Sequence, residues 1–138
     1  MYQNTGGALN TDYPYTGVQG SCDNSKVRNP KKLAGTNSGY IGKDENTFVN
    51  WNAGVVLSVI ISVNQNFMSY RSGIFNDPTC VSARTGLHAV TLNGYSTPEK
   101  YWILRNSWGA TWGEAGYFRF GKGTYGVCGL YDMGLYIN

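Results

Sequence analysis

His88 and Asn106 are the residues of this sequence whose types and spacing suit catalysis. His88 is the single histidine of the chain. If the segments that carry the two residues are neighbouring strands, the amide oxygen of Asn106 can accept a hydrogen bond from one imidazole nitrogen. That bond would fix the tautomer of the ring and direct the other nitrogen outward. The pair therefore predicts a histidine that acts on a nucleophile.

Two neighbouring strands are expected to position this pair. The segment 86–95 predicts the strand that carries His88, and 101–109 predicts a strand that ends at Asn106. A hairpin turn is expected between them at 96–99. Trp108 follows the second strand, where its ring can lie over the pair.

Further strands and one helix complete the expected fold. Asp44 is the expected N-cap of one short helix that ends before Gly54. Successive strands with short turns favour an α+β, mainly β fold, either a small antiparallel barrel or an open sheet. The segment 55–63 is a β-branched run that predicts a strand buried on both faces, and 67–75 is a mixed segment. Two short strands are expected at 116–120 and 135–137.

Size and charge exclude several classes of protein. The 138 residues suffice for one domain with a modest core. The net charge of +3 comes from scattered basic residues, which predicts no nucleic-acid partner. The most apolar run, 54–63, is about ten residues long, half of what a bilayer requires, which predicts no membrane span. No signal-peptide pattern opens the chain, as expected also of a mature or excised polypeptide.

The cysteines are three in number, Cys22, Cys80 and Cys128. In an extracellular protein an odd number leaves one thiol that needs a partner from elsewhere. No two of them have the spacing of a metal knuckle, and one histidine cannot complete a zinc site with them. The sequence therefore predicts no metal and no cofactor.

Short segments in a fixed order run through most of the chain. They are Tyr13–Tyr15 ahead of Cys22, Ser72–Phe75 ahead of Cys80, Leu87–Val90, Tyr101–Ile103 leading into Asn106–Gly109, Trp112–Glu114, Gly116–Tyr117 and Tyr125–Gly129. Together they resemble the C-terminal half of papain-like cysteine peptidases of the cathepsin L type. Each segment alone is a weak signal, but their common order makes the resemblance specific.

The resemblance implies a fold with two lobes and an active site in the cleft between them. The left lobe is helical and carries the nucleophilic Cys, whereas the right lobe is a β barrel that carries His and Asn. Residues 1–33 are then expected to be a turn-rich remnant of the left lobe, and 34–138 the right-lobe β-barrel domain. These residues include no segment like Cys-Gly-Ser-Cys-Trp and no upstream Gln for the oxyanion hole.

The resemblance also assigns roles to individual residues. His88 matches the catalytic base and Asn106 the residue that orients it, against the alternatives of a structural histidine and a turn-forming Asn. Trp108 matches the tryptophan that shields their hydrogen bond from water, or else a plain core aromatic. Trp112 resembles an aromatic residue that lines the cleft, with interior packing as the alternative.

The cysteines acquire partners only through the resemblance. Cys80 and Cys128 match the right-lobe disulfide. Cys22 matches a left-lobe cysteine whose partner lies in the other half, so it is expected to be unpaired or linked to another chain. A disulfide indicates an oxidising compartment, namely the secretory pathway, the lysosome or vacuole, or the extracellular space.

The substrate pocket is expected to be apolar, and two positions depart from the family pattern. Val59, Ala89 and Met133 match walls of the main specificity pocket, which implies a peptide substrate with an apolar side chain. Leu87 precedes the histidine where the family usually has Asp or Asn, and Ile61 stands where Asp is common.

Two hypotheses of function follow. In the first, the chain is the C-terminal half of a papain-like cysteine endopeptidase, inactive until an N-terminal half supplies the nucleophile; an incomplete copy of a full peptidase would behave in the same way. In the second, it is a catalytically dead pseudoenzyme that serves as a binding or structural subunit. Both predict a protein partner on the exposed face of the barrel.

Overall fold

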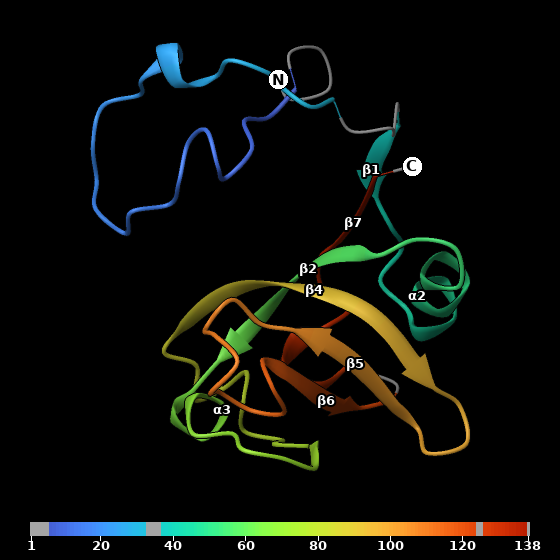
Figure 1. Ribbon diagram of the computed structural model, residues 1–138. Coiled ribbons are helices and arrows are strands. Elements are labelled where there is room, and N and C mark those ends of the chain that lie inside the picture. The colour runs from blue at the N-terminus through green and yellow to red at the C-terminus, as the bar shows by residue number, and fades with distance from the viewer. Residues whose placement is uncertain (1–5, 33–36, 124–125, 138) are drawn as a thin grey trace. The chain divides into compact units, whose positions relative to one another are not determined.

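The computed structural model describes residues 6–32, 37–123 and 126–137. The chain divides into two compact units, Met1–Asn37 with Asn138 and Ser38–Ile137. The first unit is drawn in blue in Figure 1 and consists mostly of turns, with one 3-10 helix, η1 (Asn24–Lys26). Gly7 and Lys31 form an isolated antiparallel bridge that closes its long loop. The interpretation of residues 1–33 as the remnant of another lobe stays a prediction.

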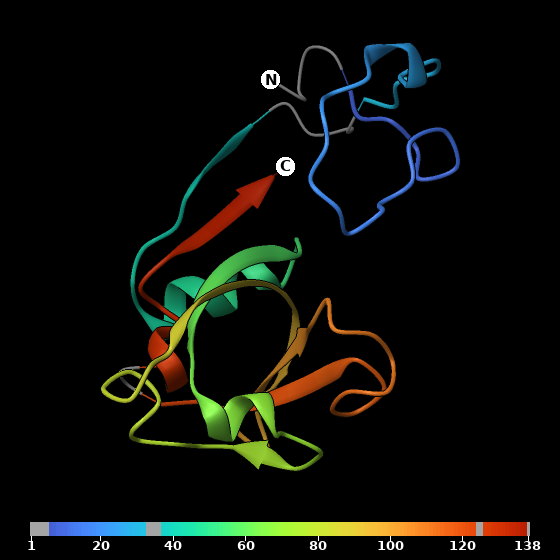
Figure 2. The same cartoon turned by 90° about the vertical axis from the view of Figure 1, so that its left-hand side faces the viewer.

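A seven-stranded sheet forms most of the second unit, in the order β1-β7-β2-β4-β5-β6-β3. Its strands curl around a common interior, as Figure 2 shows. The bounds are β1 (Ser38–Tyr40), β2 (Leu57–Val63), β3 (Ile74–Phe75), β4 (Gly86–Ser96), β5 (Tyr101–Arg105), β6 (Tyr117–Gly121) and β7 (Gly134–Ile137). The expected mainly β fold is confirmed, but β3 pairs with β6 in parallel, so the sheet is not wholly antiparallel.

Two α-helices lie at opposite ends of the curled sheet (Figure 1). Helix α2 (Glu45–Asn52) begins where expected, because the Asp44 carboxylate accepts a hydrogen bond from the N–H of Thr47 at 2.9 Å. Helix α3 (Gln65–Met68) overlaps the start of the segment 67–75, for which the sequence predicts a strand. A second 3-10 helix, η2 (Val127–Gly129), precedes β7.

The core of the second unit is apolar and rich in aromatic rings. Inward-facing side chains alternate along the strands, and Trp102, Leu104, Phe118 and Phe120 of β5 and β6 are fully buried. Phe67 of α3 is also fully buried and contacts the rings of Phe118 and Phe120. No helix in the described part of the chain is long and apolar enough to cross a membrane.

Candidate active site

His88 and Asn106 meet at the ends of two paired strands. Strands β4 and β5 are antiparallel, with Thr91 opposite Arg105, so the residue after β5 lies beside the start of β4. The Nε2 atom of His88 is 2.9 Å from Oδ1 of Asn106. Because Oδ1 can only accept, Nε2 carries the proton in this bond. The Nδ1 atom of His88 has no hydrogen-bond partner in the described part of the chain, and is available to a reacting group.

Contacts other than the one with His88 also hold Asn106 in place. Its backbone N–H donates to the carbonyl of Gly116 at 2.9 Å. Its Oδ1 accepts a second hydrogen bond, at 2.7 Å, from the N–H of Ser107. The residue is only 7% exposed, and its Nδ2 has no partner among the described residues. An amide fixed in this way can orient an imidazole without moving itself.

The imidazole of His88 also contacts an aromatic ring. Trp108 stacks on it with ring centroids 4.9 Å apart and an interplanar angle of 27°. Trp108 remains 37% exposed, so it forms part of the surface beside the pair. The stacked ring limits access of water to one face of the imidazole.

Trp112 is a buried support of this arrangement. It is 8% exposed and meets Trp108 edge to face, with centroids 5.1 Å apart. Its indole Nε1–H donates to the carbonyl of Met68 at 3.0 Å. Of the two roles weighed for this residue, interior packing is the one that the burial favours.

The loop between Asn106 and β6 is fastened by an ion pair. Arg119 donates to Glu114 from Nε at 3.0 Å and from Nη2 at 2.7 Å. Glu114 Oε1 also accepts from the N–H of Gly73 at 2.8 Å. The hydrogen bonds from Arg119 lower the pKa of the Glu114 carboxyl below its ordinary value. This bidentate pair keeps the loop that bears Trp108 and Trp112 closed against the sheet.

Of the residues expected to line the pocket, Val59 faces the core, whereas its neighbour Ile60 faces the opposite side of the sheet. Val59 is fully buried and belongs to the barrel core, so its side chain cannot line a surface pocket. Ile60 points to the other face, is partly exposed, and lies opposite Ala89 in the β2–β4 ladder. Its N–H donates to the carbonyl of Met133 at 3.2 Å. The structure therefore brings together Ile60, Ala89 and Met133.

The two departures from the family pattern adjoin His88, Leu87 on the same strand and Ile61 on the neighbouring strand β2. Leu87 is 65% exposed immediately before His88. Ile61 is buried and lies directly opposite His88 in the ladder. An apolar side chain at Ile61 suits its core position, whereas an exposed leucine at position 87 adds apolar surface next to the candidate base.

The cysteines behave in two ways. Cys80 and Cys128 form a disulfide across 48 positions of sequence, which confirms that pairing. Cys22 lies in the first unit, exposed and outside any disulfide of the described residues. No group of three or more potential metal ligands occurs among the described residues.

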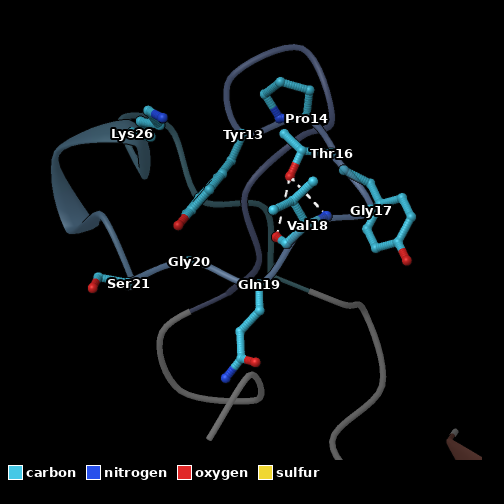
Figure 3. A pocket seen from close by; sticks show the side chains of 10 residues that line it. Tyr13, Pro14, Thr16, Gly17, Val18, Gln19, Gly20, Ser21 and Lys26 are labelled. Carbon is cyan, nitrogen blue, oxygen red and sulfur yellow. Dashed lines mark hydrogen bonds between the residues drawn. The ribbon is translucent and has the colours of Figure 1, made fainter.

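A hollow in the first unit offers no comparable chemistry. Figure 3 shows Tyr13, Pro14, Val18 and Lys26 around it. Lys26 lies over the Tyr13 ring at 5.4 Å and pairs with Asp23 at 3.7 Å. The loop residues that line it, 13–21 together with Lys26, contain no acid, histidine or thiol. The pair of His88 and Asn106 therefore remains the candidate site among the described residues.

Sequence reasoning missed the residues that support this site from beneath. Asn64, Asp77 and Phe67 lie outside the segments that carry the family resemblance, but Asn64 precedes a short helix and Asp77 precedes Pro78 in a turn. Asn is one of the preferred N-cap residues, so Asn64 was a local sign of α3.

Comparison with known proteins places the chain among cysteine proteases. The family model described as papain family cysteine protease matches residues 1–137. The chain is 35% identical to fruit bromelain of Ananas comosus over 94% of its own length and 38% of the relative. It is 37% identical to a cathepsin L-like proteinase of Fasciola hepatica over 89% of its own length and 38% of that protein.

Solved structures show the same likeness. The bromelain protease of Ananas comosus in complex with the E64 inhibitor has a TM-score of 0.82 at 34% identity. A Carica candamarcensis cysteine protease in complex with E-64 has a TM-score of 0.86 at 32% identity. These matches include 98% and 99% of this chain but only 64% of each solved chain. It thus spans less than two thirds of the proteins it resembles.

Proposed function

The chain belongs to the papain family of cysteine proteases and corresponds to a C-terminal portion of such a protein. From this premise we propose that it supplies His88 and Asn106 to the active site of a cysteine endopeptidase. The thiol and the oxyanion-hole donors would come from polypeptide outside these 138 residues. The hydrogen bond of 2.9 Å between His88 and Asn106, which leaves Nδ1 available, is the observation that carries the proposal.

In the proposed reaction His88 relays two protons, one in each half of the cycle. Nδ1 takes the proton of the incoming thiol, and the imidazolium, oriented by Asn106 and stacked on Trp108, stabilises the thiolate. The thiolate attacks the peptide carbonyl, and the imidazolium then gives its proton to the leaving amine. Water, deprotonated by the same imidazole, hydrolyses the acyl-enzyme, and the imidazolium returns that proton to the sulfur to restore the thiol.

We assign the main specificity pocket to Ile60, Ala89 and Met133. All three are apolar and adjoin one another through the β2–β4 ladder and the Ile60–Met133 hydrogen bond. An apolar side chain of a peptide substrate suits such a wall.

A groove lined by β1, β2 and β7 supports a protein partner for this unit. Its wall is almost entirely apolar and includes Val56, Leu135 and Ile137. Val56 and Ile137 are exposed. An exposed apolar groove marks a contact surface, and we propose that the N-terminal portion of the peptidase occupies it. The disulfide of Cys80 with Cys128 supports an oxidising compartment, secretory, lysosomal or vacuolar, or extracellular.

The test is reconstitution of the peptidase. The 138-residue chain alone should neither cleave peptides nor react with a thiol-directed peptidase probe. The chain joined to an N-terminal portion that carries the thiol should do both, and His88→Ala should abolish cleavage. Asn93→Ala, which is exposed on the same strand, is the matched control and should retain full activity.

A second function, that of a catalytically inactive binding subunit, draws on Leu87. This side chain is 65% exposed beside the candidate base, where it adds apolar surface suited to a partner. Under this alternative His88→Ala would leave the native assembly and its cellular role unchanged, and Leu87→Asp would disrupt the assembly. Loss of cleavage in His88→Ala would eliminate it.

A further inference from the structure

Helix α3 is too short to be stable by itself. It contains four residues, Gln65–Met68, whereas isolated helices need more than about twelve to be even marginally stable. Its first turn is held by the Asn64 side chain, whose Oδ1 accepts from the N–H of Phe67 at 3.0 Å. Asn64 is 4% exposed, so this cap is inside the protein. The position of α3 therefore depends on what holds Asn64.

Asp77 holds Asn64 from the other side. Its Oδ2 accepts from Nδ2 of Asn64 and from Nδ2 of Asn66, both at 2.9 Å. Its Oδ1 accepts from the N–H of Thr79 at 2.8 Å and from the Thr79 hydroxyl at 2.6 Å. These hydrogen bonds, with the Thr79 side chain first, hold the pKa of the Asp77 carboxyl far below its ordinary value, so it stays ionised in an acidic compartment.

The other end of α3 contacts the aromatic rings beneath the histidine. The Phe67 ring lies 5.7 Å from that of Trp108 and 5.3 Å from that of Trp112. The carbonyl of Met68 accepts the indole N–H of Trp112 at 3.0 Å. Trp108 rests on Phe67 and Trp112, and His88 stacks on Trp108. A displacement of α3 would thus release both supports of the ring that contacts His88.

We propose that Asp77 and Asn64 are positioning residues, which fix α3 so that Phe67 and Met68 hold Trp108 and Trp112 against the imidazole of His88. The anchor is the ionised carboxylate of Asp77, which lies in a turn. What it positions is the stacked pair of His88 and Trp108 in the proposed active site. The inference deepens the proposed function and rests on it. The contacts that carry the inference do not depend on that function, because His88 and Trp108 stack within this chain.

The single histidine makes the test direct. In the full 138-residue chain the imidazole protons of His88 lie near the face of the Trp108 ring, whose ring current displaces their NMR resonances from those of a free imidazole. Asp77→Ala should move these resonances towards the free values at constant pH. Asn64→Asp keeps an acceptor for the Phe67 N–H but places a second carboxylate against Asp77, and it should cause the same displacement.

Thr79→Val is the matched control. It removes one hydrogen bond to the same carboxylate but leaves the bonds to Asn64 and Asn66, so the His88 resonances should stay in place even if the chain melts at a lower temperature. If Asp77→Ala and Asn64→Asp fold, lower the melting temperature and leave the resonances unmoved, the proposal is wrong, and the anchor is merely structural. Should Asp77→Ala not fold, Asn64→Asp decides the question, and a folded Asn64→Asp variant with unmoved resonances overturns the proposal.

In the reconstituted peptidase the same variants should lower kcat by roughly tenfold with KM unchanged, because the imidazole is misplaced while the pocket is intact. Inactivity of the parent peptidase would refute the proposed function, whereas unmoved resonances would refute the positioning role. The two failures are therefore distinguishable.

Discussion

Oδ1 of Asn106 accepts two hydrogen bonds, one from its neighbour Ser107 at 2.7 Å and one from Nε2 of His88 at 2.9 Å. The first bond is local and fixes the amide, and the second uses that fixed amide to orient the ring. The pairing of β4 with β5 brings the two residues together, although they are 18 positions apart. The orientation of the candidate base therefore depends on strand register and on one local turn.

Asn106→Ala should lower kcat of the reconstituted peptidase while the barrel stays folded. A hydrogen bond to a charged group contributes about 1.5–3 kcal/mol, which corresponds to a loss of roughly 10- to 150-fold. Steady-state kinetics on a peptide substrate measures the effect, with circular dichroism to check folding. A fully active variant would show that the imidazole is oriented by other contacts.

Ile60→Ala and Val59→Ala should have different effects although the residues are adjacent. Ile60 adjoins Ala89 and Met133 on the partly exposed face, so its truncation should weaken the preference for large apolar side chains in the substrate. Val59 is buried in the core, and its truncation should cost about 2 kcal/mol of unfolding free energy with the preference unchanged. A peptide library and denaturant titration measure the two outcomes. The reverse pattern would restore Val59 to the pocket.

This pair of residues shows what the sequence could and could not predict. The run 55–63 is apolar at almost every position, so it predicts a strand but not which side chains face inward, and a shift of one residue exchanges the two faces. Helix α2 was predictable because its cap at Asp44 is local. Helix α3 was not, because four residues carry little periodicity and their position depends on Asp77, thirteen residues from Asn64 in sequence.

The contact between His88 and Asn106 was predictable for a different reason. The order of segments around His88 and Asn106 resembles a family, and the resemblance carries long-range information that local patterns lack. The stacking of Trp108 on His88 followed from it, whereas the parallel pairing of β3 with β6 did not, because a two-residue strand leaves almost no pattern in the sequence.

Glu114→Gln should flatten the acid limb of the stability profile. Arg119 lowers the pKa of Glu114 from its ordinary value of 4.5, so the folded state binds the proton more weakly than the unfolded chain. The stabilisation by this ion pair is complete at neutral pH. It begins to decline near the ordinary pKa of a glutamate and is lost as pH falls through the lower pKa of Glu114 in the folded state. Because both side chains are partly exposed, it amounts to about 1 kcal/mol.

Denaturant titrations between pH 7 and pH 3 measure this difference. Glu99→Gln is the control, since Glu99 is exposed in the turn after β4 and bonds only to Ser96 among the described residues. If the wild-type chain and Glu114→Gln declined in parallel with acid, the ion pair would not contribute to the acid limb.

Loss of the disulfide should destabilise the second unit strongly. Cys80 and Cys128 close a loop of 48 positions, for which the chain-entropy relation gives about 4 kcal/mol at room temperature. The double variant Cys80→Ser with Cys128→Ser should therefore unfold at much lower denaturant concentration. Cys22→Ser, at an exposed thiol outside any disulfide of the described residues, should match the wild-type chain. Equal midpoints for all three proteins would contradict the prediction.

Cys22 should report whether the remaining portion of the peptidase is present. In the isolated 15.2 kDa chain its exposed thiol should take up one equivalent of iodoacetamide without denaturant, while Cys80 and Cys128 remain protected as a disulfide. In the native peptidase, a disulfide between Cys22 and the other half, which the family resemblance implies, predicts no uptake at Cys22. Digestion without reduction should then release the Cys22 peptide joined to a peptide from outside these 138 residues. A Cys22 thiol that is still reactive in the native material would count against the disulfide-linked partner and would favour the binding-subunit alternative.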